Sequence, residues 1–176
     1  MTAFWCKIAA RFAPCAVLLA LLSAWLYPSA RIKNSFPIDR VVVYKKDHKL
    51  VLVSHGREVR TYKIALGGQP VGPKTQQGDH RTPEGIYILD SRNPNSHYYK
   101  AFHISYPNSK DVAAAAKAKV SPGGDIMLHG LPKEYAWVGK AHIAHDWTDG
   151  CIAVTNEEMD ELWNLIPVGT EIEIKP

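Results

Sequence analysis

Three short runs rich in β-branched residues dominate the first third of the region after residue 38. They cover Arg40–Tyr44, Leu50–Val53 and Val59–Leu66, and polar turns at Lys45–His48 and Ser54–Arg57 separate them. Apolar runs of this length between turn signals are typical of strands and are too short for stable helices. Because each turn is short, neighbouring strands must reverse direction. The pattern therefore predicts an antiparallel meander at the start of the domain.

Further elements follow downstream. The clearest is a helix after Thr155, where Thr155 and Glu158 form a capping box and apolar residues recur at helical spacing. We also expect an Ala-rich helix over Asp111–Lys119. The remaining predicted strands are Ile86–Leu89, Ala101–Tyr106, Asp125–Leu128 and Glu171–Ile174. The sequence thus predicts a mainly β domain of the β-rich α+β class, with its best-marked helix after residue 155.

The N-terminal segment has the pattern of an export signal. Lys7 and Arg11 precede the uncharged run Phe12–Tyr27, which is slightly short for a full membrane span. Small residues at Ser29 and Ala30 suit cleavage, whereas Pro28 suits it poorly. A cleaved signal peptide and an uncleaved membrane anchor both remain open. In either case the positive-inside rule places the remainder outside the cytoplasm.

These features divide the chain into residues 1–30 as signal or anchor, 31–38 as a linker and 39–176 as one domain in the periplasm or cell envelope.

The 176 residues are 46% hydrophobic and 22% charged, which excludes a disordered chain. The net charge is only +4 and no basic block stands out, so nucleic acid is not an expected partner. The membrane is an expected partner only through an uncleaved N-terminal segment.

Cys151 is the only cysteine in the predicted domain, since Cys6 and Cys15 lie in the N-terminal segment. In an oxidising compartment such a thiol is either a buried spectator or a free, reactive group. His129 ends an apolar run upstream and is followed by Gly130. A cysteine with a histidine is the minimum for an activated thiol nucleophile. Backbone N–H groups around Gly150 and Cys151 could also stabilise an oxyanion.

Three segments of the sequence together resemble the motifs of a known family. They are His129–Gly130, the run Thr148–Val154 around Cys151, and the stretch Gly78–Tyr87 with its Thr-Pro-Glu-Gly-Ile-Tyr sequence. They resemble the catalytic domain of the L,D-transpeptidase (YkuD-type) family, over nearly all of residues 39–174. The chain departs from many members at Asp149, where they have histidine, and at Ala153. An insertion at Leu131–Trp147 also separates His129 from Cys151 by 22 residues.

The resemblance implies a mixed β-sandwich or barrel fold with a helix after the cysteine. It implies that Cys151 is the nucleophile, that His129 donates and accepts the proton, and that the Gly130 carbonyl orients His129. Gly150 belongs to the same catalytic set. The implied substrates are peptidoglycan stem peptides, whose acyl group passes to an amine of another stem peptide or of a wall-anchored protein. No metal or other cofactor is implied.

Two alternatives stay open for the reaction. Water as acceptor would make the protein an L,D-carboxypeptidase or amidase-type hydrolase that trims or releases wall-linked peptides. A non-catalytic envelope-binding module is the alternative from another class. Sortases need an arginine after the cysteine, and none follows Cys151. Papain-like peptidases place the cysteine before the histidine, which is the opposite order.

Substrate contacts are predicted for Thr148, Asp149, Arg81 and Trp147. Arg81 suits bidentate recognition of a carboxylate, although a solvated surface position is the simpler interpretation. For Trp147, as for Trp137, packing is the simpler interpretation.

A second possible cluster lies within the insertion. His142, His145 and Asp146 could be read as metal ligands, but the sequence fixes no further ligand. The simpler interpretation is a segment that covers the cleft.

Overall fold

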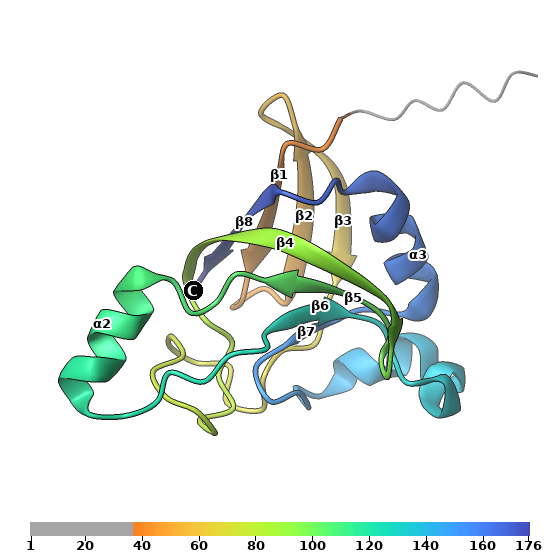
Figure 1. The fold of residues 1–176 in the computed structure, drawn as a ribbon. Coiled ribbons are helices and arrows are strands. Elements are labelled where there is room, and N and C mark those ends of the chain that lie inside the picture. The colour runs from red at the N-terminus through yellow and green to blue at the C-terminus, as the bar shows by residue number, and fades with distance from the viewer. Residues whose placement is uncertain (1–36) are drawn as a thin grey trace, which may run out of the picture. The chain divides into compact units, whose positions relative to one another are not determined.

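A computed structural model describes residues 37–176, so the predicted export segment at residues 1–30 and most of the linker lie outside the described residues. Figure 1 shows the arrangement of the elements. In chain order they are β1 (Arg40–Tyr44), β2 (Lys49–Ser54), β3 (Arg57–Lys63), β4 (Gly85–Ser96), β5 (Tyr99–Ile104), α2 (Ser109–Ala118), β6 (Met127–His129), the 3-10 segment η1 (Lys133–Ala144), β7 (Ile152–Ala153), α3 (Asn156–Leu165) and β8 (Thr170–Lys175).

All the strands belong to one mixed sheet in the order β3-β2-β1-β8-β4-β5-β6-β7, which curls into a half-barrel (Figure 1). The predicted meander is confirmed, because β1 pairs antiparallel with β2 and β2 pairs antiparallel with β3. The final strand β8 then enters the sheet between β1 and β4, parallel to β1. The β-rich α+β class is therefore confirmed.

The concave core gathers the inward positions of the strands and one face of α3. Met159, Leu162 and Ile166 are fully buried, as their helical spacing predicted. Trp163 lies beside them and packs its ring 5.3 Å from that of Phe102 on β5. Burial of each large apolar side chain contributes about 1.5–3 kcal/mol relative to exposure. This contact fixes the helix that directly follows the cysteine segment.

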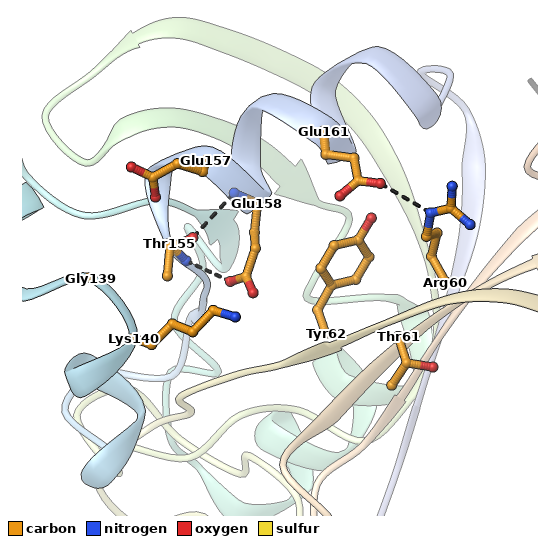
Figure 2. A pocket seen from close by; sticks show the side chains of 9 residues that line it. All are labelled: Arg60, Thr61, Tyr62, Gly139, Lys140, Thr155, Glu157, Glu158 and Glu161. Atoms are coloured by element: carbon orange, nitrogen blue, oxygen red, sulfur yellow. Dashed lines mark hydrogen bonds and ion pairs between the residues drawn. The ribbon is translucent and has the colours of Figure 1, made fainter. Parts of the chain in front are cut away.

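The predicted capping box at the start of α3 is present. The Thr155 hydroxyl accepts a hydrogen bond from the Glu158 N–H at 3.2 Å, and the Glu158 carboxylate accepts one from the Thr155 N–H at 3.1 Å. Figure 2 shows this pair beside the ion pair of Arg60 and Glu161, which links β3 to α3 at 3.1 Å. The helix therefore starts where the sequence places it and is fixed at both its first and its second turn.

Several elements differ from their predicted limits. The strand expected at Ile86–Leu89 continues as β4 to Ser96, because its polar outer half pairs with β5. Lys45 begins the predicted polar turn, yet only 3% of it is exposed. Its ammonium group donates to the carbonyls of Gly72 and Thr82 and pairs with Glu84. This buried lysine secures the loop between β3 and β4.

The insertion forms two short 3-10 stretches, joined by a kink at Gly139, where φ is +48°. It was predicted only as a segment that covers the cleft, and the structure gives it a defined shape. Between residues 37 and 176, no helix is long and apolar enough to cross a lipid bilayer.

Candidate active site

His129 and Cys151 are placed by two neighbouring parallel strands. In the register of β6 and β7, Leu128 lies beside Ile152 and His129 lies beside Ala153. Cys151 comes two residues before Ala153. Because side chains alternate along an extended chain, Cys151 lies on the same side of the sheet as His129. The parallel pairing thus places on one side of the sheet two residues that are 22 positions apart in the sequence.

The hydrogen bond of the His129 ring identifies which ring nitrogen is free. Its Nδ1 lies 2.7 Å from the carbonyl oxygen of Gly130. A carbonyl oxygen can only accept, so Nδ1 carries the proton and donates it. In the neutral ring Nε2 then has no proton and presents its lone pair. This is the tautomer that a general base at Nε2 requires.

The surroundings of His129 keep the ring neutral. Only 2% of the residue is exposed, and burial lowers its pKa from 6.5 to about 4, which the hydrogen bond to Gly130 offsets only in part. Tyr98 and Trp147 cover the ring, with centroids 4.5 Å and 5.8 Å away. Near neutral pH, His129 is therefore a base without a proton on Nε2.

The Cys151 thiol is also neutral at rest. Its Sγ lies 3.7 Å from the carbonyl oxygen of Asp125, to which it donates. Burial raises the pKa of the thiol above its usual value, and the nearby carboxylates of Asp149 and Asp125 raise it further. The Cys151 thiol and the His129 imidazole are thus both neutral at rest.

The turn before Cys151 is held by the buried Thr148 side chain. The Thr148 hydroxyl donates to the Cys151 carbonyl at 2.8 Å and accepts from the Gly150 N–H at 3.1 Å. Gly150 has a φ of +126°, and a Cβ there would lie 2.6 Å from the Arg81 carbonyl oxygen. Only glycine fits this backbone and this close approach. Gly150 therefore serves the geometry of the turn. Since its N–H is already bonded to Thr148, it is not free to hold an oxyanion.

The structure places the four predicted substrate-binding residues differently. Thr148 directs its hydroxyl into its own turn, whereas Trp147 lies against His129. Asp149 is highly exposed and pairs with His80 at 2.8 Å. The Arg81 guanidinium lies 3.5 Å from the Pro73 carbonyl oxygen. The substrate roles of these residues stay predictions.

The other residues named in the insertion also lie in different surroundings. Trp137 is 83% exposed, so the prediction that it packs is wrong; its side chain projects from η1. Asp146 accepts from the Leu66 N–H and pairs with His48. His145 is exposed, whereas His142 is buried.

Sequence reasoning missed Tyr98, which stacks on His129, because a tyrosine in a hairpin turn carries no motif. It also assigned no role to His80, whose partner Asp149 lies 69 residues away. Asn156 is a third case. Its side-chain oxygen accepts from the Leu131 N–H at 2.7 Å, and a Cβ on Gly130 would lie 2.4 Å from that oxygen. The His-Gly pair in the sequence was the only available signal for this contact.

The structure thus has a thiol and a base of fixed tautomer on the same side of a curled mixed sheet. Residues 38–174 match the model of the YkuD family, the L,D-transpeptidase catalytic domain, and the chain belongs to this family. The match covers the segment from Ile38, which is buried in the core, to Ile174 in β8.

Two relatives have similar sequences, and both are provisionally assigned as L,D-transpeptidases. YafK from Escherichia coli (strain K12) is 31% identical over 132 residues, which cover 72% of this chain and 46% of YafK. YqjB from Bacillus subtilis (strain 168) is 29% identical over 170 residues, which cover 93% of this chain and 85% of YqjB. The chain thus spans about half the length of YafK.

Solved structures share the fold. The helical cell shape determining protein Pgp2 from Campylobacter jejuni has a TM-score of 0.60 and 26% identity, over 82% of this chain and 52% of Pgp2. Bd1075 from Bdellovibrio bacteriovorus has a TM-score of 0.55 and 27% identity, over 81% of this chain and 49% of Bd1075. This chain spans about half of each.

Proposed function

We propose that this protein is a cysteine-dependent acyltransferase that acts on peptidoglycan stem peptides. The observation that carries the proposal is the Nδ1 hydrogen bond of His129 to Gly130, which leaves Nε2 as a base on the side of the sheet that carries Cys151. Family membership supports the L,D bond class. The nucleophile, the base and the substrate are the parts proposed here.

In the first half-reaction, the Cys151 Sγ attacks the carbonyl carbon of the third stem-peptide residue while its proton passes to the His129 Nε2. The carbon–nitrogen bond of the tetrahedral intermediate then breaks, and the departing amine takes the proton from Nε2. A thioester on Cys151 remains. Because the Gly150 N–H is bonded to Thr148, the Cys151 N–H is the backbone group proposed to hold the oxyanion.

In the second half-reaction, an acceptor amine attacks the thioester and gives its proton to Nε2. The carbon–sulfur bond breaks, and the proton returns to Cys151. An amine from another stem peptide gives a cross-link, and an amine from a wall protein gives anchoring. Water in the same position gives hydrolysis. The acceptor thus decides the product, while the residues that form the thioester stay the same.

The proposal includes a location in the periplasm or cell envelope, reached through residues 1–30 as a cleaved signal or an anchor. The pattern of Lys7, Arg11 and the run Phe12–Tyr27 supports this location. A contribution to cell shape also belongs to the proposal, because Pgp2 is described as a cell shape determining protein.

The test uses purified protein with tetrapeptide stem peptides and follows both the intact protein mass and the released products. We expect a covalent adduct that disappears in Cys151→Ala. We expect His129→Ala to acylate about 10²–10⁴ times more slowly, the usual contribution of a general base. His80→Ala is the matched control, because His80 is an exposed histidine paired with Asp149. An unchanged product yield in Cys151→Ala would refute the proposal.

A further inference from the structure

The peptide group between Gly130 and Leu131 sets the orientation of the proposed base. Its carbonyl oxygen accepts the hydrogen bond from the His129 Nδ1 at 2.7 Å. Strand β6 ends at His129, so this peptide group lies beyond the last residue pair of the strand. The Gly130 N–H bonds to the Lys100 carbonyl at 3.2 Å, but that N–H belongs to the preceding peptide group. Strand pairing therefore fixes the peptide group before Gly130, whereas the one after it needs another support.

A side chain of helix α3 supplies this support. The Leu131 N–H donates a hydrogen bond to the side-chain oxygen of Asn156 at 2.7 Å. Because an N–H group is a donor, the Asn156 atom that faces it must be the amide oxygen and not the amide nitrogen. Asn156 is the first residue of α3 and follows Thr155, whose capping box fixes the start of the helix. The position of Asn156 is therefore set by a well-defined helix end.

Peptide planarity connects the two hydrogen bonds. In a trans peptide group the N–H and the C=O lie in one plane and point in opposite directions. A rotation that turned the Gly130 carbonyl away from His129 would therefore also turn the Leu131 N–H away from Asn156. A typical intramolecular hydrogen bond shifts an equilibrium about fivefold, so the bond to Asn156 opposes this rotation. The same bond polarises the peptide group and makes its carbonyl a stronger acceptor.

Gly130 leaves the space that Asn156 needs. A Cβ on Gly130 would lie 2.4 Å from the Asn156 side-chain oxygen, which is closer than Cβ atoms come to other atoms. The φ of Gly130 is not in the left-handed region, so space and not backbone strain requires glycine here. The oxygen of Asn156 thus occupies the volume that a side chain at position 130 would take.

We propose that Asn156 is a positioning residue for His129. By holding the Leu131 N–H, it directs the Gly130 carbonyl towards Nδ1, keeps the proton on that nitrogen and leaves Nε2 as the basic one. Asn156 acts through the peptide group and not on the substrate. The effect on the reaction rests on the proposed function, whereas the effect on the His129 tautomer is a property of the protein alone.

The first experiment measures the tautomer of His129 near neutral pH, from two-bond proton–nitrogen correlation spectra of the imidazole rings. The signals of His129 are identified by their loss in His129→Gln. Asn156→Ala removes the acceptor and should move the ratio of the two neutral tautomers towards Nε2–H by about fivefold. Asn156→Ser should do the same, because serine suits a helix start but its side chain is one bond shorter. Asn156→Asp keeps an acceptor oxygen and should keep the proton on Nδ1.

The second experiment follows the acylation of Cys151 by a tetrapeptide stem peptide. In Asn156→Ala the maximal acylation rate should fall about tenfold to a hundredfold, because the base is misplaced. The stem-peptide concentration that gives half this rate should not change, and Asn156→Asp should restore most of the rate. In a His129→Ala background, Asn156→Ala should lower the rate by less than about twofold further, since residues that act as a unit are not additive.

Asn164→Ala is the matched control. Asn164 is an exposed asparagine on the same helix, and its side-chain nitrogen donates to the Asp160 carbonyl at 2.9 Å. It lies eight residues beyond Asn156, at the other end of α3. This variant should leave both the tautomer ratio and the acylation rate unchanged.

The outcomes separate a positioning role from a merely structural one. The inference is overturned if Asn156→Ala and Asn156→Ser keep the wild-type tautomer ratio, or if they lower the Tm without changing the maximal acylation rate. An undiminished loss of rate in the His129→Ala background would also overturn it, because Asn156 would then not act through His129. If the wild type does not acylate at all, the proposed function fails, and the spectra still decide whether Asn156 positions His129.

Discussion

The Thr148 hydroxyl is predicted to hold Cys151 in its reactive position, and Thr148→Val tests this prediction. Valine has nearly the same shape as threonine but removes both hydrogen bonds, to the Cys151 carbonyl at 2.8 Å and from the Gly150 N–H at 3.1 Å. A typical intramolecular hydrogen bond contributes about 1 kcal/mol net, and a buried partner left unpaired adds to the loss. We therefore expect a loss of about 2 kcal/mol in the free energy of unfolding.

For a domain of this size, that loss lowers the Tm by roughly 8 °C. The looser turn should also slow acylation of Cys151 by about tenfold to a hundredfold, because small misplacements of a nucleophile are costly. Thermal unfolding followed by circular dichroism measures the first effect. The rate at which the protein gains the mass of a stem-peptide acyl group measures the second.

Thr148→Ser is the matched control, since serine keeps the hydroxyl and loses only a methyl group. It should stay within about 1 kcal/mol of the wild type in stability and retain most of the acylation rate. Equal Tm values and equal acylation rates for the serine and valine variants would refute the reasoning. A raised KM with an unchanged Tm would instead support the substrate contact that the sequence predicts for Thr148.

Two further predictions concern His129 and Gly150. Since burial lowers the pKa of His129 to about 4, its stabilising contribution is complete above about pH 6.5 and is lost as the pH falls towards 4. The difference in unfolding free energy between wild type and His129→Gln should therefore change by roughly 3 kcal/mol over that range in denaturant titrations, and a constant difference would contradict the burial argument. Gly150→Ala should cost about 3 kcal/mol or more, because φ is +126° and the new Cβ would lie 2.6 Å from the Arg81 carbonyl oxygen. Its Tm, compared with that of the open-surface control Gly56→Ala, checks this prediction, and equal losses would contradict it.

Local patterns predicted many elements of the fold because their signals lie within a few residues of one another. The capping box of Thr155 and Glu158 is an example, since both partners lie in one turn of helix α3. The first three strands were equally readable from their β-branched runs. By contrast, no local signal predicted that β8 would pair with β1, because that contact joins the two ends of the domain. The burial of Lys45 could not be predicted for the same reason, because its partners Gly72, Thr82 and Glu84 lie in a distant loop.

At the candidate site, too, the local features could be predicted from the sequence and the long-range contacts could not. The motifs around Cys151 and His129 are local, so the sequence could identify both residues. Their shared side of the sheet follows from the parallel pairing of β6 with β7. The stacking of Tyr98 on His129 depends on a hairpin turn that folds back towards the strand end. Residue types alone cannot predict such a contact.

The sequence by itself determined the chemical groups of the predicted domain, which include a single cysteine, a histidine followed by glycine, and a capped helix beyond them. The tertiary structure decided which ring nitrogen of His129 carries the proton, because the position of the Gly130 carbonyl fixes the tautomer. It also decided that the insertion forms one wall of a cavity, which Tyr98, His142 and Trp147 line as well. The physical reason is that protonation, burial and cavity shape depend on groups that lie far apart in the chain and meet only when it folds.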